Sequence, residues 1–124
     1  DVVFAAAGGS GLGVLQAMAD AGKFGIGVDS NQNYLHPGSV LTSMLKRVDN
    51  AVYQSFMEAG DDATFKPGRV DLGLEEDGVG YALDEHNQAL ITPEMQAKVD
   101  ELRQGVIAGT TEVHDYYSDN ACPL

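Results

Sequence analysis

The sequence predicts an α/β fold in which a parallel sheet is flanked by helices. Residues 2–7 and 24–28 are short, continuously apolar runs, which is typical of parallel strands buried on both faces. Residues 12–19, between them, have apolar side chains at helical spacing, so the three segments predict a β-α-β unit. The chain has 124 residues and 44% apolar content, enough for a globular domain with its own core.

Turn residues separate the elements of this first unit. The first strand runs into the glycine-rich turn of residues 8–11, and Gly22 is a suitable end for the following helix. The second strand ends at Asp29, and the polar residues 30–38 predict a loop.

The next part of the chain predicts a strand, a helix and a hairpin. Residues 40–45 predict the strand, and Asp49 or Asn50 is expected to cap the helix. The buried face of that helix is expected to comprise Val48, Val52, Phe56 and Ala59. Residues 70–74 and 79–83 flank the acidic turn 75–78 and predict the two arms of a hairpin.

A final helix is expected to begin at Pro93, with Thr92 as its cap and Gly109 just after its end. An exposed pair between Glu94 and Lys98 is expected on it. Its buried stripe is expected to comprise Met95, Val99, Leu102 and Val106. Residues 112–117 predict a last extended segment.

Charge and cysteine content exclude several kinds of partner and site. The net charge of −12 repels phosphate backbones and anionic lipid, so no nucleic-acid partner is expected and a neutral or cationic ligand is favoured. A single cysteine, Cys122, allows neither an intrachain disulfide nor a zinc cluster. The chain opens directly on an apparent buried strand, so we expect it to be the end of a longer protein.

The glycine-rich turn of residues 8–11 completes neither a cofactor-binding motif nor a catalytic motif. A G-x-G-x-x-G reading from Gly9 meets Val14 at its third glycine, although a nucleotide-cofactor domain of an enzyme stays open as an alternative. A nucleophile elbow at Ser10 fails because residue 12 is leucine. No catalytic residue and no cofactor is therefore predicted.

No metal site is predicted either. Residues 29–33 begin like a calcium loop, but Tyr34 and Val40 occupy the positions of its glycine and its final glutamate. The histidines at positions 36, 86 and 114 show no ligand spacing.

A binding site is predicted from position alone. Gly8, Asp29 and Lys46 each follow or end a predicted strand, and open α/β sheets bind ligands beyond the carboxyl ends of their strands. Such an aspartate can accept two hydrogen bonds from a vicinal diol, and the lysine can donate to oxygen atoms. Equally open is a structural alternative, in which Asp29 caps a turn and Lys46 pairs with Asp49.

Four blocks of the sequence have a distinctive wording: AAAGGSGLGV (5–14), IGVDSNQ (26–32), VLTSMLKRVD (40–49) and LGLEEDGVG (72–80). In this order they resemble the basic membrane protein family of substrate-binding lipoproteins. They lie within roughly the first 80 residues, and beyond residue 83 the resemblance extends only to a final helix and strand. It implies a periplasmic-binding-protein type I fold, in which two α/β lobes close on a small molecule that is delivered to an ABC importer. It implies no enzymatic step.

The resemblance also implies the ligand and its site. The best-known branch of the family binds purine nucleosides, and the positions that match its ribose-holding residues are Gly8, Asp29 and Lys46. The expected partners are a nucleoside-like ligand, a transporter permease and the missing amino-terminal portion of the same protein. The expected location is the periplasm or the extracellular face, as a membrane-anchored lipoprotein. A ligand-sensing regulator with the same fold is a further alternative.

The resemblance implies a division into three parts. Residues 1–39 form a β-α-β unit of the carboxyl-terminal lobe, and residues 40–67 form a hinge strand and a helix that packs on the other lobe. Residues 68–124 cross back and add a hairpin and the final helix. Surfaces made for the missing lobe would be exposed in this chain alone, so we expect association or a second chain.

Overall fold

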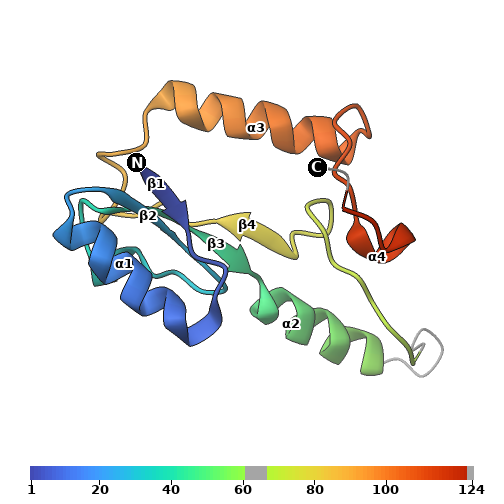
Figure 1. Ribbon diagram of the computed structural model, residues 1–124. Helices are drawn as coiled ribbons and strands as arrows, with labels where there is room; N and C mark the ends of the chain where they lie inside the picture. The colour runs from blue at the N-terminus through green and yellow to red at the C-terminus, as the bar shows by residue number, and fades with distance from the viewer. Residues whose placement is uncertain (61–66, 123–124) are drawn as a thin grey trace.

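The computed structural model describes residues 1–60 and 67–122, and their strands form one mixed sheet. The strands are β1 (Val2–Phe4), β2 (Phe24–Gly27), β3 (Val40–Lys46) and β4 (Val79–Tyr81), adjacent in that order (Figure 1). The first three are parallel, and β4 runs antiparallel to β3. Helices flank this sheet, so the predicted α/β class is confirmed.

The predicted β-α-β unit is present. Helix α1 (Gly11–Asp20) joins β1 to β2 and buries Leu15 against the sheet. A Cβ atom at Gly25 of β2 would lie 2.5 Å from the Leu15 Cδ2 atom, so the helix packs closely only because residue 25 is glycine. Gly22 adopts a φ of +62° directly after the helix, which confirms it as the stop.

The first strand is less buried than its sequence predicts. All three residues of β1 are exposed, and only Ala5, just beyond the strand, is in the core. The expectation of a fully buried strand over residues 2–7 is therefore wrong. The reason is that β1 is an edge strand, paired with β2 alone among the described residues.

Strand β3 leads almost directly into helix α2 (Val48–Ala59). The predicted cap at Asp49 or Asn50 is wrong, because Arg47 occupies the N-cap position and no side chain caps the helix. The Asp49 carboxylate instead accepts hydrogen bonds from the Arg47 guanidinium. The helix extends away from the sheet (Figure 1), which leaves Val48, Val52 and Phe56 exposed rather than buried.

The predicted hairpin is not formed. Residues 70–74 belong to no strand, and β4 pairs with β3 through Lys46 opposite Val79. The acidic residues before β4 form a turn closed by the hydrogen bond from the Gly78 amide to the Gly73 carbonyl, at 2.8 Å. Sequence alternation could not reveal that β4 pairs with β3, whose Lys46 precedes Val79 by 33 residues, rather than with the segment directly before it.

Helix α3 (Pro93–Ile107) begins as predicted. The Thr92 hydroxyl accepts a hydrogen bond from the Met95 amide at 3.2 Å, and Gly109 adopts a φ of +70° after the helix. The expected pair of Glu94 with Lys98 is wrong, since Lys98 pairs with Glu101 at 2.9 Å.

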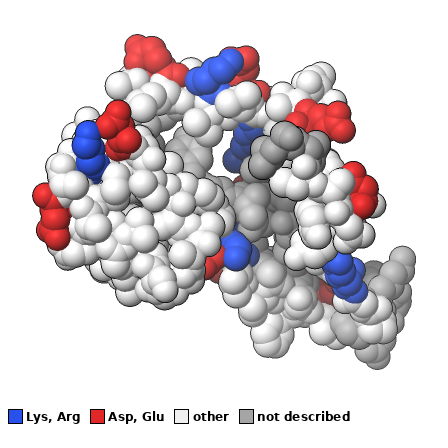
Figure 2. Space-filling model, viewed as in Figure 1, with Lys and Arg blue, Asp and Glu red and all other residues white. Residues whose placement is uncertain are grey.

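The apolar stripe of α3 faces the sheet without closing onto it. Met95, Val99 and Leu102 are 42–45% exposed, which corrects the expectation that they are buried. Pockets of about 550 and 420 Å³ separate this stripe from β3 and β4. Figure 2 shows the surface hollowed below α3, which lies on the opposite side of the sheet from α1 in Figure 1.

Replacing Thr92 with alanine is expected to lower the free energy of unfolding by about 1 kcal/mol, because the Met95 amide loses its cap. Urea unfolding followed by circular dichroism measures this change. Thr92→Ser keeps the hydroxyl and should retain most of the stability. Equal losses in both variants would show that the cap contributes nothing.

The last part of the chain is helical where an extended segment was predicted. Tyr116–Asp119 forms the short helix α4, with the Asp115 carboxylate accepting a hydrogen bond from the Tyr117 amide as its cap. Of the predicted extended segment 112–117, only residues 112–115 are non-helical. In the described ranges, none of the helices combines the length and apolar character that crossing a bilayer requires.

Candidate functional site

The structure brings Asp29 and Lys46 together. Asp29 follows β2, Lys46 ends the parallel strand β3, and the Lys46 Nζ atom lies 2.7 Å from the Asp29 Oδ1 atom. The Lys46 amide also donates to the Asp29 carbonyl at 2.9 Å. The side chain of Lys46 is 60% exposed and that of Asp29 is 53% exposed, so both can reach a ligand at this edge of the sheet.

The backbone of Asp29 adopts a rare conformation. Its φ is +73°, in the left-handed region that non-glycine residues seldom occupy. The Ser30 amide donates to the Val28 carbonyl across it, which makes a tight three-residue turn. Backbone strain of this kind persists where the surrounding structure enforces it, and it is concentrated at functional sites.

Gly8 lies at the same edge of the sheet, just after β1. It has a φ of +54° and begins the short 3₁₀ turn η1 (Gly8–Ser10) that leads into α1. Because β1 and β2 are parallel, the chain leaves both strands on one side, the side of Asp29. The glycine is exposed, so its backbone is accessible.

The structural alternative for Lys46 is wrong. Asp49 pairs with Arg47 rather than with Lys46, at 2.8 Å between the Arg47 Nη2 and Asp49 Oδ2 atoms. The hydrogen bond from Arg47 holds the pKa of the Asp49 carboxyl below its usual value.

A cluster of buried polar side chains beneath Asp29 was not predicted. Asn33, Ser43 and Asn87 are fully buried, on the short turn η2 (Asn33–Leu35), on β3 and after β4. Asn33 accepts from the Ser43 hydroxyl at 2.8 Å and donates to the Asp84 carboxylate at 3.1 Å. The only signal in the sequence is the polar run after β4, which reads equally well as an exposed loop.

Asp84 connects this cluster to the loop that follows Asp29. Its carboxylate accepts hydrogen bonds from the Asn31 side chain at 2.6 Å and from the His86 amide at 2.8 Å. The bond from Asn31 is the main cause that holds the pKa of the Asp84 carboxyl below its usual value. These hydrogen bonds therefore favour the ionised form of the Asp84 carboxyl.

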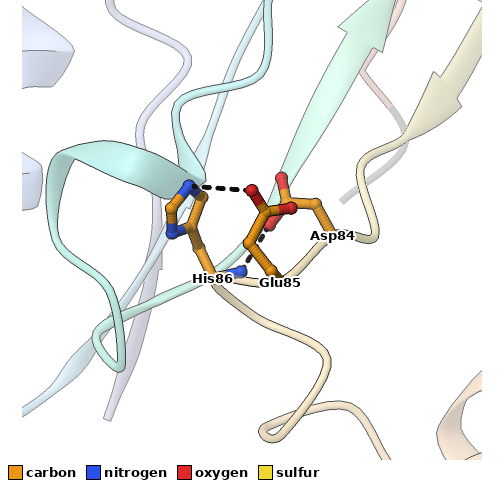
Figure 3. A group of neighbouring side chains, drawn as sticks. All are labelled: Asp84, Glu85 and His86. Atoms are coloured by element: carbon orange, nitrogen blue, oxygen red, sulfur yellow. Dashed lines mark hydrogen bonds and ion pairs between the residues drawn. The ribbon is translucent and has the colours of Figure 1, made fainter.

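Asp84, Glu85 and His86 form the group that could be taken for a metal site (Figure 3). Their possible ligand atoms lie within 4.8 Å of one another, and the His86 Nε2 atom is 3.8 Å from the Glu85 Oε1 atom. Both Asp84 oxygens already accept hydrogen bonds from protein N–H groups, and Glu85 is exposed. The group is thus accounted for as part of the loop support.

Comparison with known proteins places these features in a family. Residues 1–115 match the Bmp family, described as "ABC transporter substrate-binding protein PnrA-like". The chain is 40% identical over 89 residues to basic membrane protein D of Borreliella burgdorferi strain JD1, covering 69% of this chain and 26% of that protein. It is 32% identical to basic membrane protein A of Borreliella burgdorferi strain B31, covering 86% of this chain and 32% of that protein. The chain thus spans about a third or less of the length of these relatives.

Two solved structures share the fold. A solute-binding protein of an ABC transporter system from Aeropyrum pernix K1 matches with a TM-score of 0.67 at 28% identity, covering 94% of this chain and 42% of that one. A transcriptional activator of the comK gene from Bacillus halodurans matches with a TM-score of 0.78 at 20% identity, covering 92% of this chain and 39% of that one. The family match continues well past residue 83, so helix α3 belongs to the shared region. The chain belongs to the Bmp family of PnrA-like ABC transporter substrate-binding proteins.

Proposed function

We propose that this chain is the carboxyl-terminal portion of a two-lobed receptor that binds a nucleoside-like molecule, with a purine nucleoside favoured. Gly8, Asp29 and Lys46 would hold the ribose. The observation that carries the proposal is the 2.7 Å pair of Asp29 and Lys46, exposed at the carboxyl edge of the parallel strands. The left-handed backbone at Asp29 supports it, since such strain is concentrated at functional sites.

The chemistry of the pair fits a ribose. A carboxylate accepts hydrogen bonds from two adjacent hydroxyl groups, and an ammonium donates to a hydroxyl oxygen. Before the ligand binds, the ion pair holds the Asp29 carboxylate and the Lys46 ammonium next to each other. The net charge of −12 favours a neutral or cationic ligand over a nucleotide carrying phosphates.

The other lobe would cover surfaces that are open here. The apolar side chains of Val48, Val52 and Phe56 are 64%, 49% and 76% exposed on α2, a helix that extends away from the sheet (Figure 1). An apolar helix face of this size is typical of an interface. In the proposed receptor, residues 40–67 cross to the other lobe and residues 68–124 return, while residues 1–39 stay in the ligand-holding lobe. Residues 61–66 and 123–124 of this division lie outside the described part of the chain.

The receptor would act in import. Closure of the lobes would exclude water around the ligand, and the closed form would deliver it to a transporter permease. Family membership supports transport rather than catalysis. The proposed location is the periplasm or extracellular face, with a lipid anchor on the complete protein.

A thermal-shift screen of the full-length protein tests this function. Inosine, adenosine, guanosine, free bases, ribose, riboflavin and NAD would be compared at the same concentrations. A ligand at a hundredfold excess over its dissociation constant adds about 2.7 kcal/mol of stability, so a purine nucleoside should raise the melting midpoint clearly. A shift with NAD and none with nucleosides would instead favour a cofactor-binding domain.

A ligand-sensing regulator is the second candidate. The fold match to a transcriptional activator favours it, because the same architecture serves there in a regulator. A DNA-binding segment in the full-length protein, with DNA affinity that changes on adding nucleoside, would support this candidate. A permease-dependent uptake of nucleoside would support the receptor.

A further inference from the structure

We propose that a polar cluster, made of the buried Asn33, Ser43 and Asn87 and the half-buried Asp84, positions Asp29 for its ligand. These four are positioning residues, because each acts on the Asp29 turn through the loop and none needs to contact the sugar. The inference rests on the proposed function, in which Asp29 binds the ligand.

The connection begins at the Asp29 turn. Residue 29 is held in its left-handed conformation by what fixes the chain on either side of it. Before the turn, the Val28 amide donates to the Gln32 side-chain oxygen at 2.9 Å. After the turn, the Gln32 amide donates to the Ser43 hydroxyl at 2.9 Å. Gln32 thus ties the start of the loop to its end, and Ser43 ties the loop to β3.

Ser43 is the centre of the network. Its hydroxyl accepts from the Gln32 amide and donates to the Asn33 side-chain oxygen, so both hydrogen-bonding functions are used in a fully buried position. A buried hydroxyl with this double role specifies one arrangement of its neighbours, because any other leaves a polar group without a partner. The strand that carries Ser43 ends three residues later at Lys46, the partner of Asp29.

The far side of the cluster fixes the loop to the segment after β4. Asp84 accepts from the side chains of Asn31 and Asn33 and is itself held by its amide, which donates to Asn87. Asn87 donates to the carbonyls of Leu41 and Ala82 at 2.9 and 3.0 Å. The loop after Asp29 is therefore held between strand β3 and the segment after β4, with Asn33 and Ser43 completely inaccessible to solvent.

Gly27 of β2 leaves room for the same cluster. A Cβ atom at Gly27 would lie 2.7 Å from the Gln32 Oε1 atom and 2.8 Å from the Ser43 Oγ atom. The network thus occupies the space in which a side chain at residue 27 would lie. An arrangement this close leaves the backbone of the Asp29 turn little freedom, and ligand-holding groups require such support.

The test compares Ser43→Ala with Val40→Ala in the full-length protein. Both residues are fully buried on β3, but Val40 contributes only an apolar side chain. Two quantities would be measured well below the melting midpoint: inosine affinity by calorimetry, and hydrogen exchange of the Ser30 and Lys46 amides, which close the Asp29 turn. Ser43→Ala should weaken affinity by about tenfold, as removal of a supporting hydrogen-bond partner does at metal sites.

In Ser43→Ala the two amides should also exchange faster, whereas Val40→Ala should lower the melting midpoint and change neither affinity nor that exchange. If Ser43→Ala does not fold, Asp84→Asn replaces it, with the same expected result. Unchanged exchange and affinity in the cluster variant would overturn the proposal. Faster exchange with unchanged affinity would also overturn it, provided that Asp29→Ala weakens binding.

The proposed function can fail separately. It fails if no nucleoside binds, or if Asp29→Ala leaves inosine affinity unchanged. The exchange measurement then decides alone whether the cluster fixes the turn: faster exchange in Ser43→Ala would retain that part, and unchanged exchange would overturn it.

Discussion

Replacing Asp29 with alanine is expected to weaken nucleoside binding by the full-length protein by about 30-fold or more. The loss of a charged hydrogen-bond partner costs about 2 kcal/mol, and each 1.4 kcal/mol is about a tenfold change in affinity. Calorimetric titration with inosine measures the effect. Two causes would contribute, because alanine removes the carboxylate and also tolerates the φ of +73° poorly.

Asp29→Asn separates these causes. Asparagine adopts the left-handed conformation more readily than alanine, so this variant keeps the turn and removes only the charge. Asp49→Ala is a matched control, since Asp49 is likewise an exposed aspartate paired with a basic side chain, Arg47. It should leave affinity unchanged. Wild-type affinity in both Asp29 variants would remove Asp29 from the site.

Gly27→Ala is expected to lower the free energy of unfolding by about 1–3 kcal/mol, the usual effect of overpacking a buried position. The added Cβ atom would lie within 3 Å of Ser43 Oγ and of two atoms of Gln32, so the hydrogen bonds around the Asp29 turn would have to shift. Urea unfolding measures the change, and nucleoside affinity should fall with it.

Gly13→Ala is the control for the glycine substitution. Gly13 lies inside α1, and a Cβ atom there would meet nothing within 4 Å. Alanine at an open helix position stabilises a protein by about 0.5–1 kcal/mol relative to glycine. The two glycine-to-alanine changes in this β-α-β unit should therefore change the free energy of unfolding in opposite directions. An unchanged free energy of unfolding in Gly27→Ala would show that the cluster rearranges at no cost to stability.

The candidate site could be predicted in part because parallel strands place their ends together. Asp29 and Lys46 were predicted from strand ends, and the structure brings them to 2.7 Å. The support beneath them could not be predicted. Asn33, Ser43 and Asn87 are polar residues whose sequence context indicates loop or strand surface, and they become buried only because three separate segments meet.

The errors in the predicted burial and strand pairing share one physical origin. Hydrophobic spacing shows that a face is apolar, but not which partner covers it. The stripe of α3 and the face of α2 were expected to be buried, and both are substantially exposed among the described residues. The predicted hairpin is wrong for the same reason, since β4 pairs with β3 rather than with residues 70–74.

The β-α-β unit, the helix that begins at Pro93 after the Thr92 cap, and the family could all be predicted from the sequence, because they depend on local periodicity, caps, glycines and short motifs. The place of β4, the exposure of the helix faces and the polar cluster around the loop after Asp29 are known only from the folded chain. Those features depend on contacts between residues tens of positions apart, and the hydrogen-bond partners of a buried side chain are set by such contacts rather than by its neighbours in the chain.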